Sequence, residues 1–300
     1  MTPPDLEPTG ERLLPDHYHG QLVHAEHLAR YRLAAQLASG KRVLDVACGE
    51  GYGSAMLRNG GAAAITGVDL DAATVAHVRE RHSIDARQAD IRELPFADDS
   101  FDLVVSFETI EHVDEPERAL DELARVRAAG GLLVISTPIA GQYQVQNEFH
   151  VREFGHDEFV GLLRERFASV QLLFQHNWLT SALLDRETMG QQDGESRLDV
   201  ELTKVRAVPD GGELYLVALC GEQIDAPLRQ VAVMAGTDES HDLAHRLDDA
   251  IRTQERFRDA FEASEQSLEE IRRNAARMAS SWSWRLTKPL RAAGRLRRRR

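Results

Sequence analysis

The stretch VLDVACGEGYG, residues 43–53, decides the fold. It begins as a short apolar run, ends in a cluster of glycines, and is followed by a helical pattern over residues 54–58. A second apolar run ends at Asp69, eighteen residues after Gly51. This layout predicts a strand, a loop, a helix and a second strand that together hold an adenosine-bearing cofactor.

The spacing of the glycines indicates which cofactor binds. A dinucleotide site has G-x-G-x-x-G, which brings phosphates to a helix N-terminus. Here the pattern is D-x-x-C-G-x-G-x-G, and residues 43–53 hold no Lys or Arg that would meet phosphate. The acid Asp45 beside the loop suits a cationic ligand without phosphate, and Asp69 can accept hydrogen bonds from ribose hydroxyls.

These motifs resemble the class I S-adenosylmethionine-dependent methyltransferases, whose loop reads (E/D)-x-G-x-G-x-G. Further matching segments follow in the same order, namely ADI at 89–91, FADDSFDLVVSF at 96–107 and GGLLVISTP at 130–138. The resemblance spans roughly residues 9–221. It implies an α/β fold with a doubly wound, mostly parallel seven-stranded sheet, in which 170–174 and 213–219 form a closing antiparallel pair.

The same resemblance implies which residues hold S-adenosylmethionine. In the family, an acid at the end of the third strand binds the adenine amino group, and the next backbone amide meets the ring. Carried over by position, the cofactor-binding residues are Asp45, Ala47, Gly49, Gly51, Asp69, Leu70, Asp90, Ile91 and Phe107.

The segment FETIEHV, residues 107–113, follows the expected fourth strand. A helix starting near Glu108 would place Glu108, Glu111 and His112 on one face, because residues three and four apart are neighbours on a helix. That face would lie beyond the carboxyl ends of the strands, where ligands bind. Two carboxylates and an imidazole that converge there favour a divalent cation.

The pair E-x-x-E-H and H-x-x-E-F resembles magnesium-dependent methyltransferases that act on sugar hydroxyls at the 3′ ends of small RNAs, and a related E-x-x-E-H occurs in quinone-biosynthesis O-methyltransferases. Carried over, Mg²⁺ or another divalent cation is held by Glu108, Glu111, His112 and His150. Many class I members carry E-H-V without a metal, so an alternative stays open in which His150 or His112 acts as general base. Glu111 is the third predicted catalytic residue. The remaining isolated histidines are expected at the surface or in packing: His24, His27, His82 and His156.

The chain divides into five predicted regions. Residues 1–20 form an N-terminal segment and 21–221 the methyltransferase domain, in which 21–39 is a helix and the polar 176–212 connection a substrate lid. Residues 222–239 form a linker. Apolar positions in steps of three and four predict a coiled-coil helix over 240–282, and hence a homodimer, although a helix folded back on the domain fits the same pattern. Residues 283–300 are a basic tail.

Charge and composition limit the partners. The net charge is −13, although residues 285–300 carry eight Lys or Arg and no acid. An acidic body argues against nucleic acid, whose phosphates dominate its affinity for proteins. Two cysteines make no disulfide framework, which favours a cytoplasmic protein. The SWSWRLTKPLR segment at 281–291 resembles the tails of bacterial enzymes of surface-polysaccharide assembly. It implies contact with the inner face of an anionic membrane or with a glycan-assembly enzyme; a solvated tail is an equal alternative.

These observations predict an S-adenosylmethionine-dependent O-methyltransferase that acts on a sugar hydroxyl of a glycan or glycoconjugate. One alternative acceptor is a quinone precursor or secondary metabolite. An alternative of another class is a scaffold protein of a glycan-assembly complex that binds the cofactor without turnover.

Overall fold

The computed structural model describes residues 6, 12–19, 21–142, 149–178, 180–189, 198, 201–204, 207–208, 212–225, 227–235, 258, 271–274 and 276–277. The chain separates into two compact units, Met1–Gly236 and Thr237–Arg300. The first unit holds the sheet and the candidate site.

A single seven-stranded sheet forms the centre of the first unit, in the order β3-β2-β1-β4-β5-β7-β6. The first five strands run parallel, and β7 lies antiparallel between β5 and β6. This topology confirms the predicted doubly wound, mostly parallel sheet with a closing antiparallel pair. The strands are β1 (Arg42–Val46), β2 (Ala64–Asp69), β3 (Asp85–Gln88), β4 (Phe101–Ser106), β5 (Arg127–Pro138), β6 (Ser169–Gln175) and β7 (Tyr215–Gly221).

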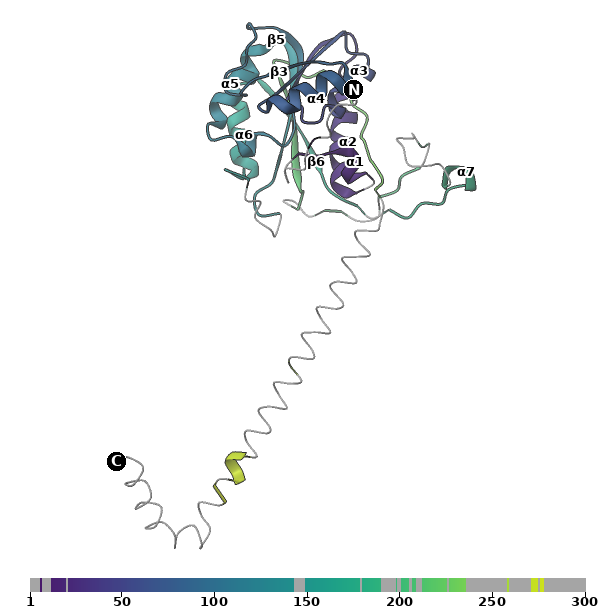
Figure 1. Ribbon diagram of the computed structural model, residues 1–300, viewed down its shortest axis with the longest axis vertical. Coiled ribbons are helices and arrows are strands. Elements are labelled where there is room, and N and C mark those ends of the chain that lie inside the picture. Colours follow the sequence, from purple (N-terminus) through teal and green to yellow (C-terminus); the bar gives the residue numbers. More distant parts are fainter. Residues whose placement is uncertain are drawn as a thin grey trace, which may run out of the picture. The chain divides into compact units, whose positions relative to one another are not determined.

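Helices cover both faces of the sheet. Figure 1 shows α5 and α6 together on one flank of the domain, with α1, α2 and α4 on the other. A sheet of parallel, apolar strands needs crossover helices on both faces, because both of its faces must be buried. The helices are α1 (Pro15–Tyr18), α2 (Leu22–Ala35), α3 (Tyr52–Asn59), α4 (Ala72–His82), α5 (Pro116–Val126), α6 (His156–Arg164) and α7 (Arg186–Met189), with a 3₁₀ turn η1 (Ile110–His112).

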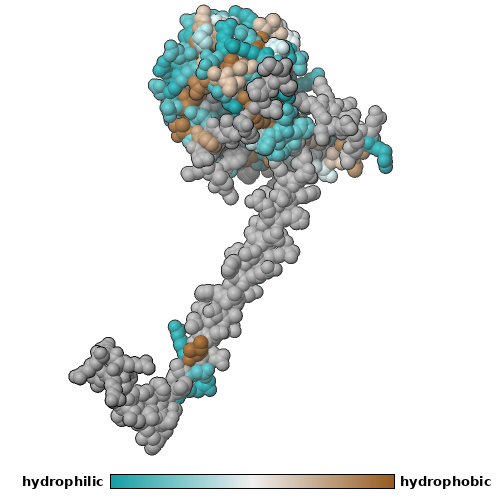
Figure 2. Space-filling model, in the orientation of Figure 1, coloured by the Kyte–Doolittle hydropathy of each residue, from teal (hydrophilic) through white to brown (hydrophobic). Residues whose placement is uncertain are grey.

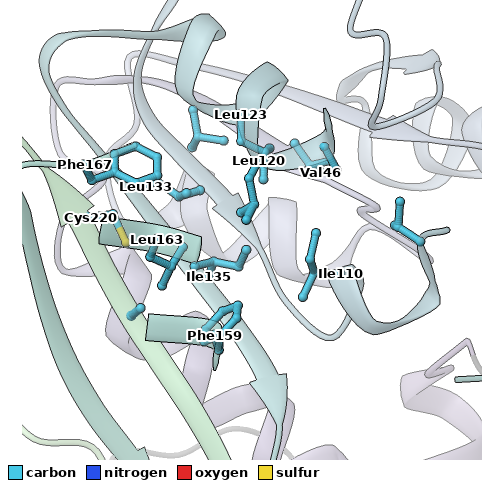
Figure 3. Packing of buried hydrophobic residues seen from close by; sticks show 14 of the residues in the cluster. Val46, Ile110, Leu120, Leu123, Leu133, Ile135, Phe159, Leu163, Phe167 and Cys220 are labelled. Atoms are coloured by element: carbon cyan, nitrogen blue, oxygen red, sulfur yellow. The ribbon is translucent and has the colours of Figure 1, made fainter. Parts of the chain in front are cut away.

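The alternation of side chains along β5 separates two cores. Leu133 and Ile135 join the cluster that α5 and α6 cover, whereas Leu132 and Val134 join the cluster under α2 and α3. Successive strand residues point to opposite faces, so one apolar run supplies both layers. Figure 3 shows the first cluster, in which side chains of α5 and α6 surround those of β5: Leu120, Leu123, Leu133, Ile135, Phe159 and Leu163.

The domain continues beyond residue 221, where the sequence predicted a linker. Ile224, Leu228 and Val231 pack against the cluster under α2. The side chain of Gln36 donates to the carbonyl of Arg229 and accepts from its N–H, at 3.0 and 2.9 Å. The segment is therefore part of the domain as far as these contacts reach.

Most of the predicted C-terminal elements lie outside the described residues. Within the second unit, residues 271–274 and 276–277 are helical, and the coiled coil, the homodimer and the basic tail stay predictions. In the described part of the chain, no helix is both long and apolar enough to cross a membrane.

Candidate active site

The loop after β1 has the backbone conformation that its glycines permit. Gly49 and Gly51 have φ of 54° and 95°, and Ala47 has φ of 58°. Positive φ is open to glycine and costs a residue with a Cβ, so the alanine marks local strain. A Cβ on Gly51 would lie 2.9 Å from Val78 Cγ2 of α4. The loop is thus held close to α4 as well as turned back toward the sheet.

Asp69 lies at the end of β2, and its carboxylate contacts both the loop after β1 and the residues that follow β2. One carboxylate oxygen accepts the Gly49 N–H at 3.0 Å, and the other accepts the Asp71 N–H at 3.0 Å. Each oxygen keeps a second acceptor site, so the carboxylate can still take hydrogen bonds from a ribose. The next side chain, Leu70, is 68% exposed. A flat aromatic ligand beside Asp69 would cover this apolar surface.

Asp45 is fully buried under the loop. Its carboxylate accepts hydrogen bonds from Ser54 Oγ at 2.5 Å and from Tyr31 Oη at 3.2 Å. Burial raises the pKa of Asp45 to about 7, although those two hydrogen bonds oppose the rise. A ligand that carries positive charge would favour the ionised form and lower this pKa, as the sequence argument for a cationic cofactor requires.

Other predicted cofactor residues follow the ends of β4 and β3. Phe107 follows β4 and packs edge-on against the Tyr31 ring, with centroids 5.1 Å apart. Asp90 follows β3, and its carboxylate accepts from Arg92 Nη2 at 2.7 Å and Nε at 3.0 Å. Ile91 is partly buried against the core. An adenine amino group would therefore share Asp90 with Arg92.

The chain after β4 differs from the prediction. Glu108 has φ of 49°, and only Ile110–His112 is helical, as a single 3₁₀ turn. The predicted helix starting near Glu108 is therefore wrong, because a residue in the left-handed region cannot begin a right-handed helix. Glu108, Glu111 and His112 do not share a helical face.

Three of the four predicted metal ligands nevertheless converge. One ligand atom from each of Glu111, His112 and His150 lies within 4.8 Å of the others. The rings of His112 and His150 meet edge to face with centroids 4.9 Å apart. Glu108 is not in this group, so the structure brings together three of the four residues that the sequence predicted as ligands.

Backbone contacts bring the distant His150 to η1. The carbonyl of Glu111 accepts the N–H groups of Val151 and Arg152, at 2.9 and 3.1 Å. His112 Nδ1 lies 3.0 Å from the carbonyl oxygen of Phe149. A carbonyl only accepts, so Nδ1 carries the proton, and a neutral His112 has its lone pair on Nε2. This is the arrangement that orients metal-binding histidines.

Glu111 is the most constrained member of the cluster. It is 1% exposed; Thr137 Oγ1 donates to Oε2 at 3.3 Å, whereas Oε1 is buried without a hydrogen-bond partner among the described residues. Burial and the nearby charge of Glu108 raise its pKa well above the ordinary value. A buried carboxylate oxygen with no partner costs free energy that a cation would offset. One carboxylate and two imidazoles suit Mn²⁺, Fe²⁺ or Zn²⁺ better than Mg²⁺, which prefers oxygen ligands.

Glu108 instead belongs to a buried polar network that the sequence did not reveal. Ser136 Oγ donates to Glu108 at 2.6 Å, and Arg30 Nη1 lies 3.8 Å from the same carboxylate. The Arg30 guanidinium lies over the Tyr215 ring, 4.7 Å from its centroid, and the Tyr215 hydroxyl donates to Glu26 at 2.7 Å. The charged residues on the buried side of α2 could have indicated this network in the sequence, because charged residues are seldom buried unless they are paired.

Part of the predicted lid contacts this network. Asn177 donates to the Glu26 carboxylate, and Gln175 Nε2 donates to the Glu26 carbonyl at 3.0 Å. Trp178 is 46% exposed, and Lys204 Nζ lies 4.8 Å from its ring centroid. The start of the 176–212 connection is thus fixed to α2, while its role as a lid stays a prediction.

Comparison with known proteins agrees with this geometry. Residues 44–135 match the family model described as a methyltransferase domain. This part of the chain is similar to a methyltransferase domain. A probable S-adenosylmethionine-dependent methyltransferase of Mycobacterium tuberculosis is 38% identical over 168 residues, which cover 54% of this chain and 61% of that protein. The match supports S-adenosylmethionine as the cofactor of the domain.

Two other relatives act on different named acceptors. A probable phthiotriol/phenolphthiotriol dimycocerosates methyltransferase of Mycobacterium ulcerans is 39% identical over 131 residues, covering 42% of this chain and 47% of that protein. A demethylmenaquinone methyltransferase of Clavibacter sepedonicus is 41% identical over 118 residues, covering 37% and 47%. The chain thus spans between about half and three fifths of the length of these relatives.

Proposed function

We propose that this chain is an S-adenosylmethionine-dependent O-methyltransferase that methylates a sugar hydroxyl of a glycan or glycoconjugate with the help of a divalent cation. The observation that carries the proposal is the convergence of Glu111, His112 and His150 within 4.8 Å, at the end of β4. In an open sheet, that end of the strands is where ligands bind. The glycine loop after β1 opens at the same end.

The residues on each side of this site have separate tasks. S-adenosylmethionine, when bound, supplies an electrophilic sulfonium methyl group. Asp69 and the loop around Gly49 would hold its nucleoside, and the ionised Asp45 carboxylate would complement its positive charge. The protein must then align an acceptor hydroxyl with that methyl and remove the hydroxyl proton.

His112 and His150 are the groups placed for that proton. A cation held by Glu111, His112 and His150 would lower the pKa of an acceptor hydroxyl and make a general base less necessary. Without a cation, His150 is the better base, because its Nδ1 lies 3.4 Å from Glu153 Oε1, which would stabilise the imidazolium. In both versions the acceptor approaches from the side of residues 149–152.

A sugar acceptor rests on two features. Three protein ligands leave coordination positions that two neighbouring hydroxyl oxygens of a sugar would fill. The tail segment at 281–291 also resembles those of enzymes of surface-polysaccharide assembly. The same tail would bring the protein to the inner face of the membrane or to a glycan-assembly enzyme.

An O-methyltransferase of a lipid or quinone acceptor is a second candidate. Its support is a pair of apolar side chains on either side of His150, since Phe149 is 41% exposed and Val151 57% exposed. Figure 2 shows hydrophilic residues over the visible face of the domain with smaller hydrophobic areas between them. A relative named for phthiotriol-type lipids favours the same direction.

An acceptor panel with the full chain separates these candidates. Methyl transfer is measured by mass spectrometry with a glycoside that carries neighbouring hydroxyls, its deoxy analogue that lacks one of them, and a catechol. The proposal expects turnover of the glycoside, at least tenfold less with the deoxy analogue, and loss of turnover in EDTA that Mn²⁺ or Mg²⁺ restores. Preference for the catechol selects the second candidate, and indifference to EDTA removes the cation. Cofactor binding with no turnover on the entire panel favours the scaffold alternative.

A further inference from the structure

A second cluster of metal-ligating side chains lies on the other side of the glycine loop. Glu50 projects from the loop between Gly49 and Gly51, and it meets His77 and His82 from the last part of α4. One ligand atom from each of these three residues lies within 4.8 Å of the others. Glu50 and His77 are 7% and 6% exposed, and the His82 side chain is 16% exposed. The sequence had assigned His82 to the surface or to packing.

Two distances in this cluster are close to those between the ligands of a tetrahedral ion. His77 Nε2 and His82 Nε2 each lie 3.1 Å from the same oxygen, Glu50 Oε1. Ligand atoms about 2.1 Å from a tetrahedral Zn²⁺ lie about 3.4 Å apart. Each of these two nitrogens is therefore within a few tenths of an ångström of the distance from Oε1 that an ion requires, and the residues already face one another from the loop and from α4.

We propose that Glu50, His77 and His82 form a second divalent-cation site, with Zn²⁺ or a similar ion as its ligand, that ties the cofactor loop to α4. One carboxylate oxygen and two imidazole nitrogens are the donor set of three-ligand zinc sites, and water would fill the fourth position. Both imidazoles now direct Nε2 at a carboxylate, so binding requires the neutral tautomers with the proton on Nδ1.

Arg81 is the competitor for the same oxygen. Its Nε lies 3.1 Å from Glu50 Oε1, and its Nη2 lies 3.0 Å from Asp16 Oδ2. The Arg81 side chain is 39% exposed, so it can leave Glu50 and keep its pair with Asp16. This contact makes the proposal testable, because removing Arg81 weakens a cluster held by hydrogen bonds and strengthens a cation site.

Ion binding at this cluster would act on the cofactor loop. A Cβ on Gly51 would lie 3.0 Å from His82 Cδ2, and Glu50 Oε2 accepts the Tyr52 N–H at 3.2 Å. Glu50 therefore already links the start of α3 to α4. A cation bound there would hold the loop in its cofactor-binding conformation without touching the cofactor.

The test uses the full chain without an affinity tag. The double variant His112→Ala/His150→Ala removes the cluster near Glu111, so remaining tight binding reports on the second site. We expect it to bind one equivalent of Zn²⁺, measured by competition with a chromogenic chelator, and to give the visible bands of tetrahedral Co²⁺. Adding His77→Ala should lower the Zn²⁺ affinity at least tenfold, whereas adding Arg81→Ala should preserve or raise it.

Three outcomes would overturn the proposal: no tight equivalent in the double variant, an octahedral Co²⁺ spectrum, or a loss of affinity with Arg81→Ala as large as with His77→Ala. Because His77 is buried, circular dichroism in EDTA checks that each variant folds. If the His77→Ala protein does not fold, Glu50→Gln, which keeps the shape of the side chain, replaces it with the same expected loss. These readouts do not depend on methyl transfer, so they stand apart from the proposed function.

Discussion

The cofactor side and the acceptor side of the site are built differently. On the cofactor side, the contacts run between backbone and nearby sequence: Gly49 N–H meets Asp69, and Asp45 is joined to Ser54. On the acceptor side, contacts join distant segments, such as Glu111 with Val151 and Arg30 with Gln175. In the proposed function, the first half would recognise one fixed ligand through a rigid loop. The second half is assembled from loops and side chains that can change without disturbing the sheet, as expected where acceptors differ among relatives.

The largest effect that would test this division is expected at Glu111. Glu111→Gln keeps the size of the side chain but removes the charge that holds a cation, so turnover should fall at least a hundredfold while cofactor affinity stays unchanged. Turnover is measured by mass spectrometry and affinity by isothermal titration. Glu165→Gln, at the exposed end of α6, is the control and should behave as wild type. A Glu111→Gln enzyme with near wild-type turnover would remove the cation from the mechanism.

The opposite pattern is expected at Asp69. Asp69→Ala removes a carboxylate that accepts two backbone N–H groups and would accept the ribose hydroxyls, so cofactor binding should weaken by about 2–3 kcal/mol. That is a loss of roughly 30- to 150-fold in affinity, measured by isothermal titration. Acceptor affinity at saturating cofactor should not change. Unaltered cofactor affinity would contradict the role of Asp69 in binding the ribose, and the difference between the cofactor side and the acceptor side would lose that support.

A smaller effect, on the free energy of unfolding, should distinguish the tightly packed cofactor side from the rest of the domain. A Cβ on Gly53 would lie 2.0 Å from Tyr31 Cζ, so Gly53→Ala displaces the ring that holds Asp45. Overpacking of this kind costs about 1–3 kcal/mol of the free energy of unfolding, measured by urea denaturation. Gly161→Ala in α6 is the control: a Cβ there meets nothing within 4 Å, and alanine favours helix by up to about 1 kcal/mol. Equal effects at both positions would show that the loop is not tightly packed.

The smallest effect is a pH dependence from Asp45, whose pKa is about 7 in the ligand-free fold. Because this pKa is raised from 3.8, the ligand-free protein should lose stability as the pH rises from about 4 to about 7. A cationic cofactor favours the ionised form, so its affinity should rise over the upper part of that range, by at most tenfold per pH unit, and level off above it. Isothermal titration against pH measures the slope. Asp45→Asn should flatten it, and an equal slope in both proteins would place the titrating group elsewhere.

The contrast also explains what the sequence could predict. The glycine loop and its acids lie within 27 residues, from 43 to 69, and their spacing alone determines how they meet. The mostly parallel seven-stranded sheet followed from the resemblance that these motifs carry. The turn at Glu108 was not predictable, because its left-handed backbone is stabilised by a contact with Ser136, 28 residues away.

The remaining differences have the same origin. The Glu50 cluster joins a loop to residues 27 and 32 positions further on, at the end of α4, and no spacing rule connects them. The network around Arg30 joins α2 to β6 and β7, about 145 to 189 residues away. Local patterns therefore predicted the half of the site that is local, and the resemblance predicted that the distant His150 joins Glu111 and His112. The contacts of Glu50 and Arg30, which form only in the completed fold, were missed.

Helix α2 connects the two halves. Tyr31 bonds Asp45 beneath the cofactor loop, whereas Glu26 and Arg30, less than two turns away, bond the ends of β6 and β7 and approach Glu108. A continuous helix of 14 residues bends little, so α2 holds the contacts beneath the cofactor loop and those near Glu108 at a fixed spacing. Inserting one residue into α2 between Arg30 and Tyr31 would turn one set of contacts by about 100° relative to the other. Changes in β6 and β7 could therefore alter the acceptor side while α2 and its contact with Asp45 stay the same.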